Sequence, residues 1–312
     1  MRIVFMGTPE FAVPSLQILV ENGFDVAAVV TVPDKAAGRG QHLSQSAIKK
    51  CALNYGLPIL QPEKLKSTEF IAQLQSLQAD LQVVVAFRML PESVFTMPPL
   101  GCINLHASLL PAYRGAAPIN WAIINGEKET GLTTFYIEQQ IDAGRIIGQC
   151  RLPIGERETV GELHDKMMHQ GAQLLLDTVR QIATGTEQSY PQIISENMPL
   201  APKLNNDNCR IDWQQPAHRI DNLIRGLNPY PAAFTFLNAQ WLKIYAADII
   251  LEQHEHLLGT IVFEGKKMWR IAVADGYIVP NRVQLEGKKQ MTASDFLNGY
   301  RQDLAAAGRL SN

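Results

Sequence analysis

Short apolar runs and amphipathic stretches alternate along the first half of the chain. Residues 81–87 are almost continuously apolar, which is typical of a strand buried on both faces. Apolar side chains recur at helical spacing over residues 159–182, after a Thr159–Glu162 capping pattern, and predict a long helix. Other strands are expected at residues 2–6, 25–31, 58–60 and 102–105, and other helices at 10–21, 46–55, 67–77 and 118–125. This alternation predicts an α/β fold with a mostly parallel sheet, closed by an antiparallel pair at 132–137 and 146–152.

The pattern changes after residue 188. Residues 189–203 are polar and rich in proline, so we expect a linker between a first domain at 1–188 and a second at 204–312. The second domain begins with a helix expected at 217–227. Short strand-like runs then follow at 233–237, 241–247, 259–263, 269–273 and 277–283. Five short strands separated by turns suggest a small barrel.

Composition adds few constraints. The chain has 312 residues and a net charge of −2, and residues 203–312 carry 13 Lys and Arg against 11 Asp and Glu. This mild excess permits a nucleic-acid surface on the second domain without requiring one. The four cysteines are not at metal-ligand or redox spacing, so we expect reduced, mostly buried thiols. The N-terminus enters a strand without a signal-peptide layout, and no stretch is long and apolar enough to span a membrane, which favours a cytoplasmic location without membrane association.

Candidate chemistry gathers at the end of the strand at 102–105. Asn104 and His106 are two residues apart, so they point to one face of the strand. An amide and an imidazole aimed at one spot suit an acyl-type transfer, which needs a stabilised oxyanion and a moved proton. Asp142, in an Asp-Ala-Gly turn, could orient the imidazole. The alternative is that Asn104 and His106 only satisfy hydrogen bonds in a strand end, and that Asp142 is an ordinary turn residue.

Three other features of the sequence bear on function. Gly7-Thr8-Pro9 follows the first strand but lacks the three glycines of a dinucleotide-binding turn, which argues against a nicotinamide-dependent dehydrogenase. Residues 33–42 form a basic, glycine-flanked segment containing Lys35 and Arg39. It is either a solvated loop or a loop that binds phosphates. A metal pair at His254 and His256 is less favoured than a solvated turn.

The Asn-x-His-x-Ser-Leu-Leu-Pro run beginning at Asn104, with Asp142 downstream, resembles the formyltetrahydrofolate-dependent formyltransferases. The resemblance extends to Gly7–Ala12, to Pro33-Asp34 with Gly38-Arg39-Gly40, and to Arg114–Pro118 and Ile211–Trp213. These segments look like those of family members that act on initiator methionyl-tRNA. It implies a Rossmann-like, mostly parallel sheet followed by a small C-terminal OB-like β-barrel that binds tRNA.

The resemblance also implies roles for individual residues. Asn104, His106 and Asp142 would be catalytic, and Arg39 and Lys35 would contact tRNA. The folate site would contain Ser108, Leu109, Leu110 and Pro111, together with Phe87, Arg88, Met89 and Leu90. The chain departs from the family at Arg145, where an acidic residue is usual, so the detail of the nearby folate-site loop is open.

The implied reaction moves the formyl group of 10-formyltetrahydrofolate to the amino group of methionine on initiator methionyl-tRNA, without a metal. We expect a monomer. Two alternatives remain: a formyltransferase acting on an amino sugar or another small amine, and a nucleic-acid-binding protein with an inactive folate fold. Intact Asn104, His106 and Asp142 argue against the second.

Overall fold

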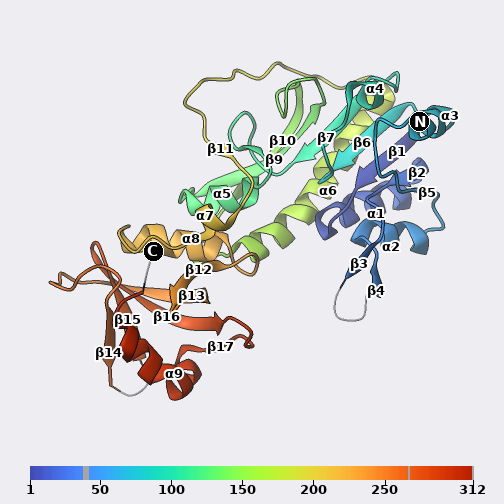
Figure 1. The fold of residues 1–312 in the computed structure, drawn as a ribbon. Helices are drawn as coiled ribbons and strands as arrows, with labels where there is room; N and C mark the ends of the chain where they lie inside the picture. Colours follow the sequence, from blue (N-terminus) through green and yellow to red (C-terminus); the bar gives the residue numbers. More distant parts are fainter. Residues whose placement is uncertain (38–41, 266–267, 311–312) are drawn as a thin grey trace. The chain divides into compact units, whose positions relative to one another are not determined.

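The computed structural model describes residues 1–37, 42–265 and 268–310 (Figure 1). The chain forms two compact units, each assembled from segments that are not continuous in sequence. Unit 1 contains residues 1–115, 130–152 and 164–200, and unit 2 contains residues 116–129, 153–163 and 201–312.

A seven-stranded sheet forms the centre of unit 1, in the order β10-β9-β7-β6-β1-β2-β5. Its strands are β1 (Arg2–Gly7), β2 (Asp25–Val30), β5 (Ile59–Leu60), β6 (Leu81–Val85), β7 (Cys102–His106), β9 (Glu129–Tyr136) and β10 (Ile146–Pro153). Neighbouring strands from β5 to β7 are parallel, whereas β9 runs antiparallel to β7. The mostly parallel sheet is therefore as predicted, and β7 lies inside it with its carboxyl end carrying His106.

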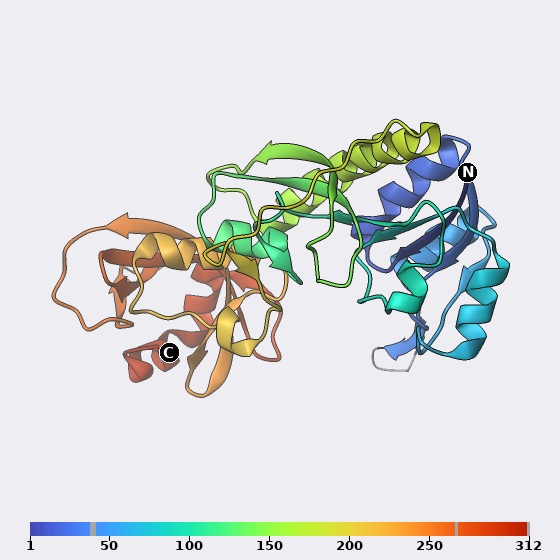
Figure 2. The same ribbon diagram turned by 90° about the horizontal axis from the view of Figure 1, so that it is seen from above.

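Helices cover both faces of this sheet, as the alternating pattern requires (Figure 2). The helical segments are η1 (Glu10–Ala12), α1 (Val13–Glu21), α2 (Ala47–Asn54), α3 (Thr68–Ser76), α4 (Glu92–Phe95) and α6 (Val160–Thr184). Phe70 of α3 and Val94 of α4 pack with Val4 and Val84 on one face. Residue Gly171 of α6 approaches the other face so closely that a Cβ there would lie 2.9 Å from Leu105. Both faces of β6 and β7 are consequently buried, which explains their apolar sequences.

Local signals set the ends of several helices. Ser46 and Ser67 cap α2 and α3 by accepting hydrogen bonds from the backbone N–H groups of Lys49 and Phe70. At the start of α6, the Glu162 carboxylate accepts from the Thr159 backbone N–H at 2.8 Å, and this bond lowers the pKa of Glu162. The capping pattern predicted from the sequence is confirmed.

Unit 2 contains an antiparallel sheet in the order β12-β13-β16-β15-β14, with β17 paired to β16. Its strands are β12 (Ala233–Leu237), β13 (Gln240–Leu251), β14 (Ile261–Glu264), β15 (Met268–Val273), β16 (Gly276–Leu285) and β17 (Met291–Thr292). Its helices are α5 (Pro118–Ile124), α7 (Asn206–Cys209), α8 (Ala217–Gly226) and α9 (Ala293–Ala307). The core contains Trp213, Trp269 and Phe296, all fully buried.

Two features of unit 2 differ from the sequence prediction. The predicted barrel is an open sheet, because β12 and β14 stand at opposite ends of the strand order. Helix α9 was not predicted, although Thr292 caps its start and Gly308 ends it with φ +62°. Helix α5, which precedes β9 in the chain, belongs to unit 2 because Asn120 Nδ2 donates to the Gly226 carbonyl of α8 at 2.8 Å.

Three short hairpin or edge strands complete the described elements of the first half: β3 (Lys35–Ala37), β4 (His42–Ser44) and β8 (Arg114–Gly115). Strands β3 and β4 pair antiparallel. The segment predicted to be a linker contains β11 (Leu200–Ala201), and Tyr190 forms an antiparallel bridge with Ile146 at the start of β10.

Candidate active site

His106 is the last residue of β7, and the residue is 6% exposed. Asn104 lies two residues earlier on the same strand, in register between Val84 of β6 and Phe135 of β9, and is half-buried. The structure therefore places both side chains on one face near the carboxyl end of β7, as predicted from their spacing.

The two nitrogens of the His106 ring face two oxygens from different segments. Nε2 donates a hydrogen bond to the Tyr113 carbonyl at 2.9 Å, and Nδ1 lies 3.9 Å from the Asp142 carboxylate. The same Asp142 oxygen accepts the Gly115 backbone N–H at 3.0 Å. The ring also packs edge-on against Phe135, with centroids 6.5 Å apart. These contacts fix the plane of the imidazole.

Asp142 is held in the loop between β9 and β10 by backbone geometry as well as by its carboxylate. Its φ is +51°, a left-handed conformation that Asp tolerates better than most side chains. A Cβ on Gly144 would lie 1.8 Å from the Tyr136 carbonyl, so only glycine fits there. Gln192 donates from Nε2 to the carbonyls of Asp142 (3.0 Å) and Gly144 (2.8 Å).

Gln192 was missed by the sequence analysis, which assigned its segment to a linker. A side chain that contacts residues 48 and 50 positions earlier leaves no periodic signal in the sequence. Tyr113 and Gly115 were missed for a related reason, because they act through backbone groups whose chemistry does not depend on the side chain.

The predicted folate loop at 108–111 is tied to the sheet beside this site. The Ser108 hydroxyl donates to the Ala112 carbonyl at 2.6 Å, so it is engaged within its own turn. Thr133 of β9 donates to the Ser108 carbonyl and accepts the Leu110 N–H. Pro111 follows Leu110 through a cis peptide bond, and Leu109 is half-buried.

The second predicted folate segment, Phe87–Leu90, follows β6 directly. Phe87 and Leu90 pack against the core of unit 1, whereas the Met89 side chain is 75% exposed. Arg88 donates to the carbonyls of Pro62 and Glu63, and burial lowers its pKa. Because β6 is adjacent to β7, this segment and His106 belong to neighbouring strand ends.

The structure describes one of the two predicted tRNA contacts. Lys35 is exposed at the start of β3, and Arg39 lies outside the described residues. At the base of the hairpin, Asp34 accepts from Lys49 Nζ at 2.5 Å and from Gln61 Nε2 at 2.9 Å. These bonds hold the pKa of Asp34 below its usual range.

Arg145, the departure from the family pattern, points toward the segment after α6. Its Nε donates to the Ser189 hydroxyl at 3.0 Å, and its terminal nitrogen donates to the Ser189 carbonyl. The exposed Arg145 side chain is therefore hydrogen-bonded to Ser189. The Asp142 carboxylate is hydrogen-bonded to a different residue, Gly115.

Across residues 1–37, 42–265 and 268–310 no cluster of three or more His, Cys, Asp or Glu is arranged to hold a metal ion. His254 Nε2 instead donates to the carbonyls of Val273 and Gly276. Cys51, Cys102 and Cys209 are buried free thiols, and burial raises the pKa of Cys102.

Within the described part of the chain, none of the helices has the length and apolarity to span a membrane.

Comparison with known proteins decides the family. Residues 1–179 match the family described as "Formyl transferase", and residues 203–301 match "Formyl transferase, C-terminal domain". The chain belongs to the formyl transferase family. The sequence resemblance to formyltransferases is thereby confirmed.

Several members of the formyl transferase family are similar over nearly the whole chain. Methionyl-tRNA formyltransferase of Phocaeicola vulgatus is 52% identical, with 96% of each chain covered. That of Bacteroides fragilis is 50% identical, covering 96% of this chain and 95% of its own. Among solved structures, the sugar 3N-formyl transferase WlaRD, described with dTDP and 5-N-formyl-THF, shares the fold with a TM-score of 0.65 at 22% identity. It covers 93% of this chain and 99% of its own.

Proposed function

We propose that this formyl transferase moves the formyl group of 10-formyltetrahydrofolate to the amino group of methionine on initiator methionyl-tRNA. The acceptor is chosen because the chain is about 50% identical to methionyl-tRNA formyltransferases over nearly their full length. The sugar formyltransferase is only 22% identical, so it supports the fold and not a sugar acceptor.

Catalysis is assigned to Asn104, His106 and Asp142. The neutral methionine amine attacks the formyl carbon, and the carbonyl electrons move onto the formyl oxygen. The Asn104 amide and the His106 imidazole, as N–H donors, stabilise that oxyanion. Collapse breaks the bond to N10 of the folate, which leaves as tetrahydrofolate after N10 gains a proton. The attacking nitrogen loses its proton to Asp142, directly or through a water.

The geometry around His106 supports this assignment. Its Nε2–H already donates to a carbonyl oxygen, that of Tyr113, at 2.9 Å. The group is thus oriented as a donor before substrate binds, and the formyl oxygen replaces or shares this acceptor during transfer. Removing one preorganised donor of this kind typically raises the barrier by roughly 2.7–4 kcal/mol.

The folate co-substrate is assigned to the strand ends next to this site. Backbone groups of Phe87, Arg88, Met89 and Leu90 form one side, and Ser108, Leu109, Leu110 and Pro111 form the other. Thr133 donates to the Ser108 carbonyl and accepts from the Leu110 N–H, and these two bonds favour a rigid wall at 108–110. The 5-N-formyl-THF with which the WlaRD structure is described belongs to the same folate class. No metal takes part in this proposal.

The tRNA partner is assigned to Lys35 of β3, to Arg39 and to the C-terminal region at 204–312, with 1–188 as the catalytic region and 189–203 as the connection. The enzyme is proposed to act as a cytoplasmic monomer. The hydrogen-bonded Asp34, Lys49 and Gln61 support the hairpin role, because they fix the point at which the hairpin leaves the sheet.

An acceptor comparison tests the function. Purified protein and 10-formyltetrahydrofolate labelled in the formyl group are mixed with initiator methionyl-tRNA, uncharged tRNA, free methionine or a dTDP-linked amino sugar. The proposal expects label only on charged tRNA, with kcat/KM for the other amines lower by orders of magnitude. Preferred transfer to the amino sugar would replace this function with the alternative one.

Arg39 is tested separately. Replacing Arg39 by Ala should weaken productive tRNA use by about 1–3 kcal/mol, the usual scale for an Arg contact to nucleic acid. Arg39→Lys should restore little if the contact is bidentate, because an ammonium is a point charge. The measurement is kcat/KM for charged tRNA at two salt concentrations, with thermal unfolding as the control. If wild type and Arg39→Ala have equal kcat/KM for charged tRNA, residues 33–42 are a solvated loop that does not contact the tRNA.

A further inference from the structure

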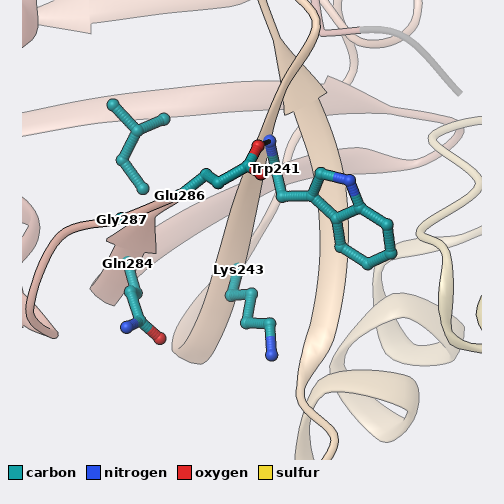
Figure 3. Close-up of a pocket in the computed structure, with 6 residues that line it drawn as sticks. Trp241, Lys243, Gln284, Glu286 and Gly287 are labelled. Atoms are coloured by element: carbon teal, nitrogen blue, oxygen red, sulfur yellow. Dashed lines mark hydrogen bonds between the residues drawn. The ribbon is translucent and has the colours of Figure 1, made fainter. Parts of the chain in front are cut away.

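A pocket of about 230 Å³ opens on the sheet of unit 2 (Figure 3). It is lined by Trp241, Lys243, Gln284, Leu285, Glu286 and Gly287, and we call it the β13–β16 pocket. Lys243 of β13 pairs directly with Gln284 of β16, so their side chains lie on one face of the sheet.

The indole of Trp241 forms an ordered aromatic wall in this pocket. It stacks on Phe234 with centroids 4.1 Å apart and planes at 22°, and Phe236 meets it edge-on at 5.8 Å. The guanidinium of Arg210 in turn lies 5.0 Å above the Phe236 ring. Trp241 is only partly buried although Phe234 is buried beneath it. The ring therefore presents its remaining surface in a fixed orientation, as a stacking surface requires.

Polar groups beside the indole are fixed as well. Lys243 Nζ donates to the Pro231 carbonyl at 3.0 Å, and an ammonium has two further N–H donors. The Gln284 amide is oriented by the Tyr245 hydroxyl at 2.7 Å and by the Lys288 carbonyl at 2.8 Å. The Tyr245 hydroxyl carries its proton at neutral pH, as tyrosine ordinarily does, and burial raises its pKa further. Glu286 accepts from the Trp241 backbone N–H at 3.3 Å, which leaves carboxylate lone pairs for other donors.

This combination suits an unpaired nucleotide. An aromatic face stacks on any base, and Lys243 supplies the cation for the adjoining phosphate. Gln284 and Glu286 supply the groups that hydrogen-bond a base edge, and a carboxylate selects a base that presents N–H donors. A bare phosphate is a poor fit, because Glu286 would repel it. Arg210, which lies over the Phe236 ring, and Lys288, whose carbonyl holds the Gln284 amide, add positive charge beside the pocket and favour a polyanion.

We propose that the β13–β16 pocket binds an unpaired nucleotide of the tRNA, with the base stacked on Trp241 and its phosphate on Lys243. The proposal rests on the proposed function, since that function supplies the RNA. It goes further by naming the residues of the C-terminal region that make the contact. The base is one that donates hydrogen bonds to Glu286.

Tryptophan fluorescence of the full-length protein tests the stacking directly. Of the four tryptophans, Trp213 and Trp269 are fully buried, and Trp121 is fixed by a bond from Nε1 to the Pro202 carbonyl. Initiator tRNA should quench the emission of wild type and of Trp121→Phe to a similar degree. Trp241→Phe should lose most of the quenching and keep most of the affinity, because a phenyl ring still stacks. An unchanged quench in Trp241→Phe would overturn the proposal.

Affinity measurements give the second arm. Trp241→Leu should raise the Kd for tRNA about 5- to 150-fold, the range expected for losing one stacked base. Lys243→Gln should raise it and flatten its salt dependence, more than the charge-matched change Arg219→Gln on the exposed surface of α8. Thermal unfolding checks each fold, and Trp241→Phe keeps the test valid if Trp241→Leu unfolds. Equal Kd values for wild type and folded Trp241→Leu would contradict the proposal.

Small probes separate stacking from simple anion binding. Guanosine monophosphate should quench Trp241 at millimolar concentration, Glu286→Gln should weaken that effect, and inorganic phosphate should not reproduce it. Quenching by phosphate alone would overturn the base-stacking assignment. At saturating charged tRNA the Trp241 variants should transfer formyl groups with normal kcat and a raised KM. If the Trp241 variants formylate methionyl-tRNA with the wild-type KM for tRNA, the β13–β16 pocket does not bind the tRNA. The proposed function would still stand.

Discussion

His106 Nδ1 lies 3.9 Å from the Asp142 carboxylate, and that carboxylate is already held at 3.0 Å by the Gly115 backbone N–H. The distance is longer than a hydrogen bond, so the two groups face each other with room to close. Catalytic hydrogen bonds are often loose in the free enzyme and tighten when substrate is bound.

Replacing Asp142 by Asn tests this relationship. The amide keeps the size of the side chain but removes its charge and its basicity, so kcat should fall by about 10²–10⁴. The Asp142→Asn/His106→Ala double variant should be little slower than His106→Ala alone, because the two residues act as a unit. Single-turnover rates at saturating substrates are the measurement, with thermal unfolding as the control. Full additivity of the two losses would separate Asp142 from His106.

Gln192 should position the Asp142 loop from a distance. Gln192→Leu removes both donated bonds, to the Asp142 and Gly144 carbonyls, and should lower kcat by about 10- to 100-fold through misplacement of the carboxylate. Gln188→Leu, an exposed change in the same segment, is the matched control. KM for the folate should change less than kcat. A Gln192→Leu enzyme with normal kcat would mean that the loop holds its shape unaided.

Gly144 should not accept any side chain. A Cβ there would lie 1.8 Å from the Tyr136 carbonyl, so Gly144→Ala must move the loop and should cost about 1–3 kcal/mol in the free energy of unfolding, with a loss of activity. Gly299→Ala in α9 is the opposite case, because nothing lies within 4 Å of the added Cβ. That change should stabilise by about 0.5–1 kcal/mol. Denaturant unfolding of both variants, run together, checks the pair, and equal stability of the two would refute the steric argument.

The Asp34–Lys49 pair predicts a pH dependence of stability. Hydrogen bonds from Lys49 and then Gln61 lower the pKa of Asp34 in the folded protein below its usual value of 3.8. Such a group stabilises the fold above pH 3.8, and the contribution is lost as pH falls through the lowered folded-state pKa. The Tm of wild type should therefore exceed that of Asp34→Asn at pH 7, and the difference should shrink below pH 3.8. A constant difference between pH 7 and pH 3, or one matched by the exposed Asp303→Asn, would exclude this linkage.

The sheet of unit 1 could be predicted because its signals are local. β6 and β7 are apolar runs buried on both faces, and the position of His106 follows from the end of β7. The strands of unit 2 could be located in the same way, but whether a sheet closes depends on the pairing of its first and last strands. Those strands are β12 and β14, which are separated in the chain by residues 238–260, and no local pattern encodes their relation. Helix α9 is a different case, since Thr292, Asp295 and Gly308 marked its ends in the sequence and were overlooked.

In the candidate site too, some residues could be recognised from local sequence and others could not. Asn104, His106 and Asp142 carry distinctive chemistry, and their sequence motif could be recognised. The backbone groups of Tyr113 and Gly115 that hold them carry no side-chain signal. Gln192 could not be found either, because its contacts span about fifty residues and its segment has a polar, proline-rich composition.

Single-turnover formyl transfer with competing acceptors tests the central claim most directly. Wild type and His106→Ala are each mixed with formyl-labelled 10-formyltetrahydrofolate and equal concentrations of initiator methionyl-tRNA and a dTDP-linked amino sugar. The account predicts that wild type places the label on the methionine amino group of the tRNA and that His106→Ala slows this step by at least about 10². Label on the sugar, or undiminished transfer to methionyl-tRNA by His106→Ala, would contradict it.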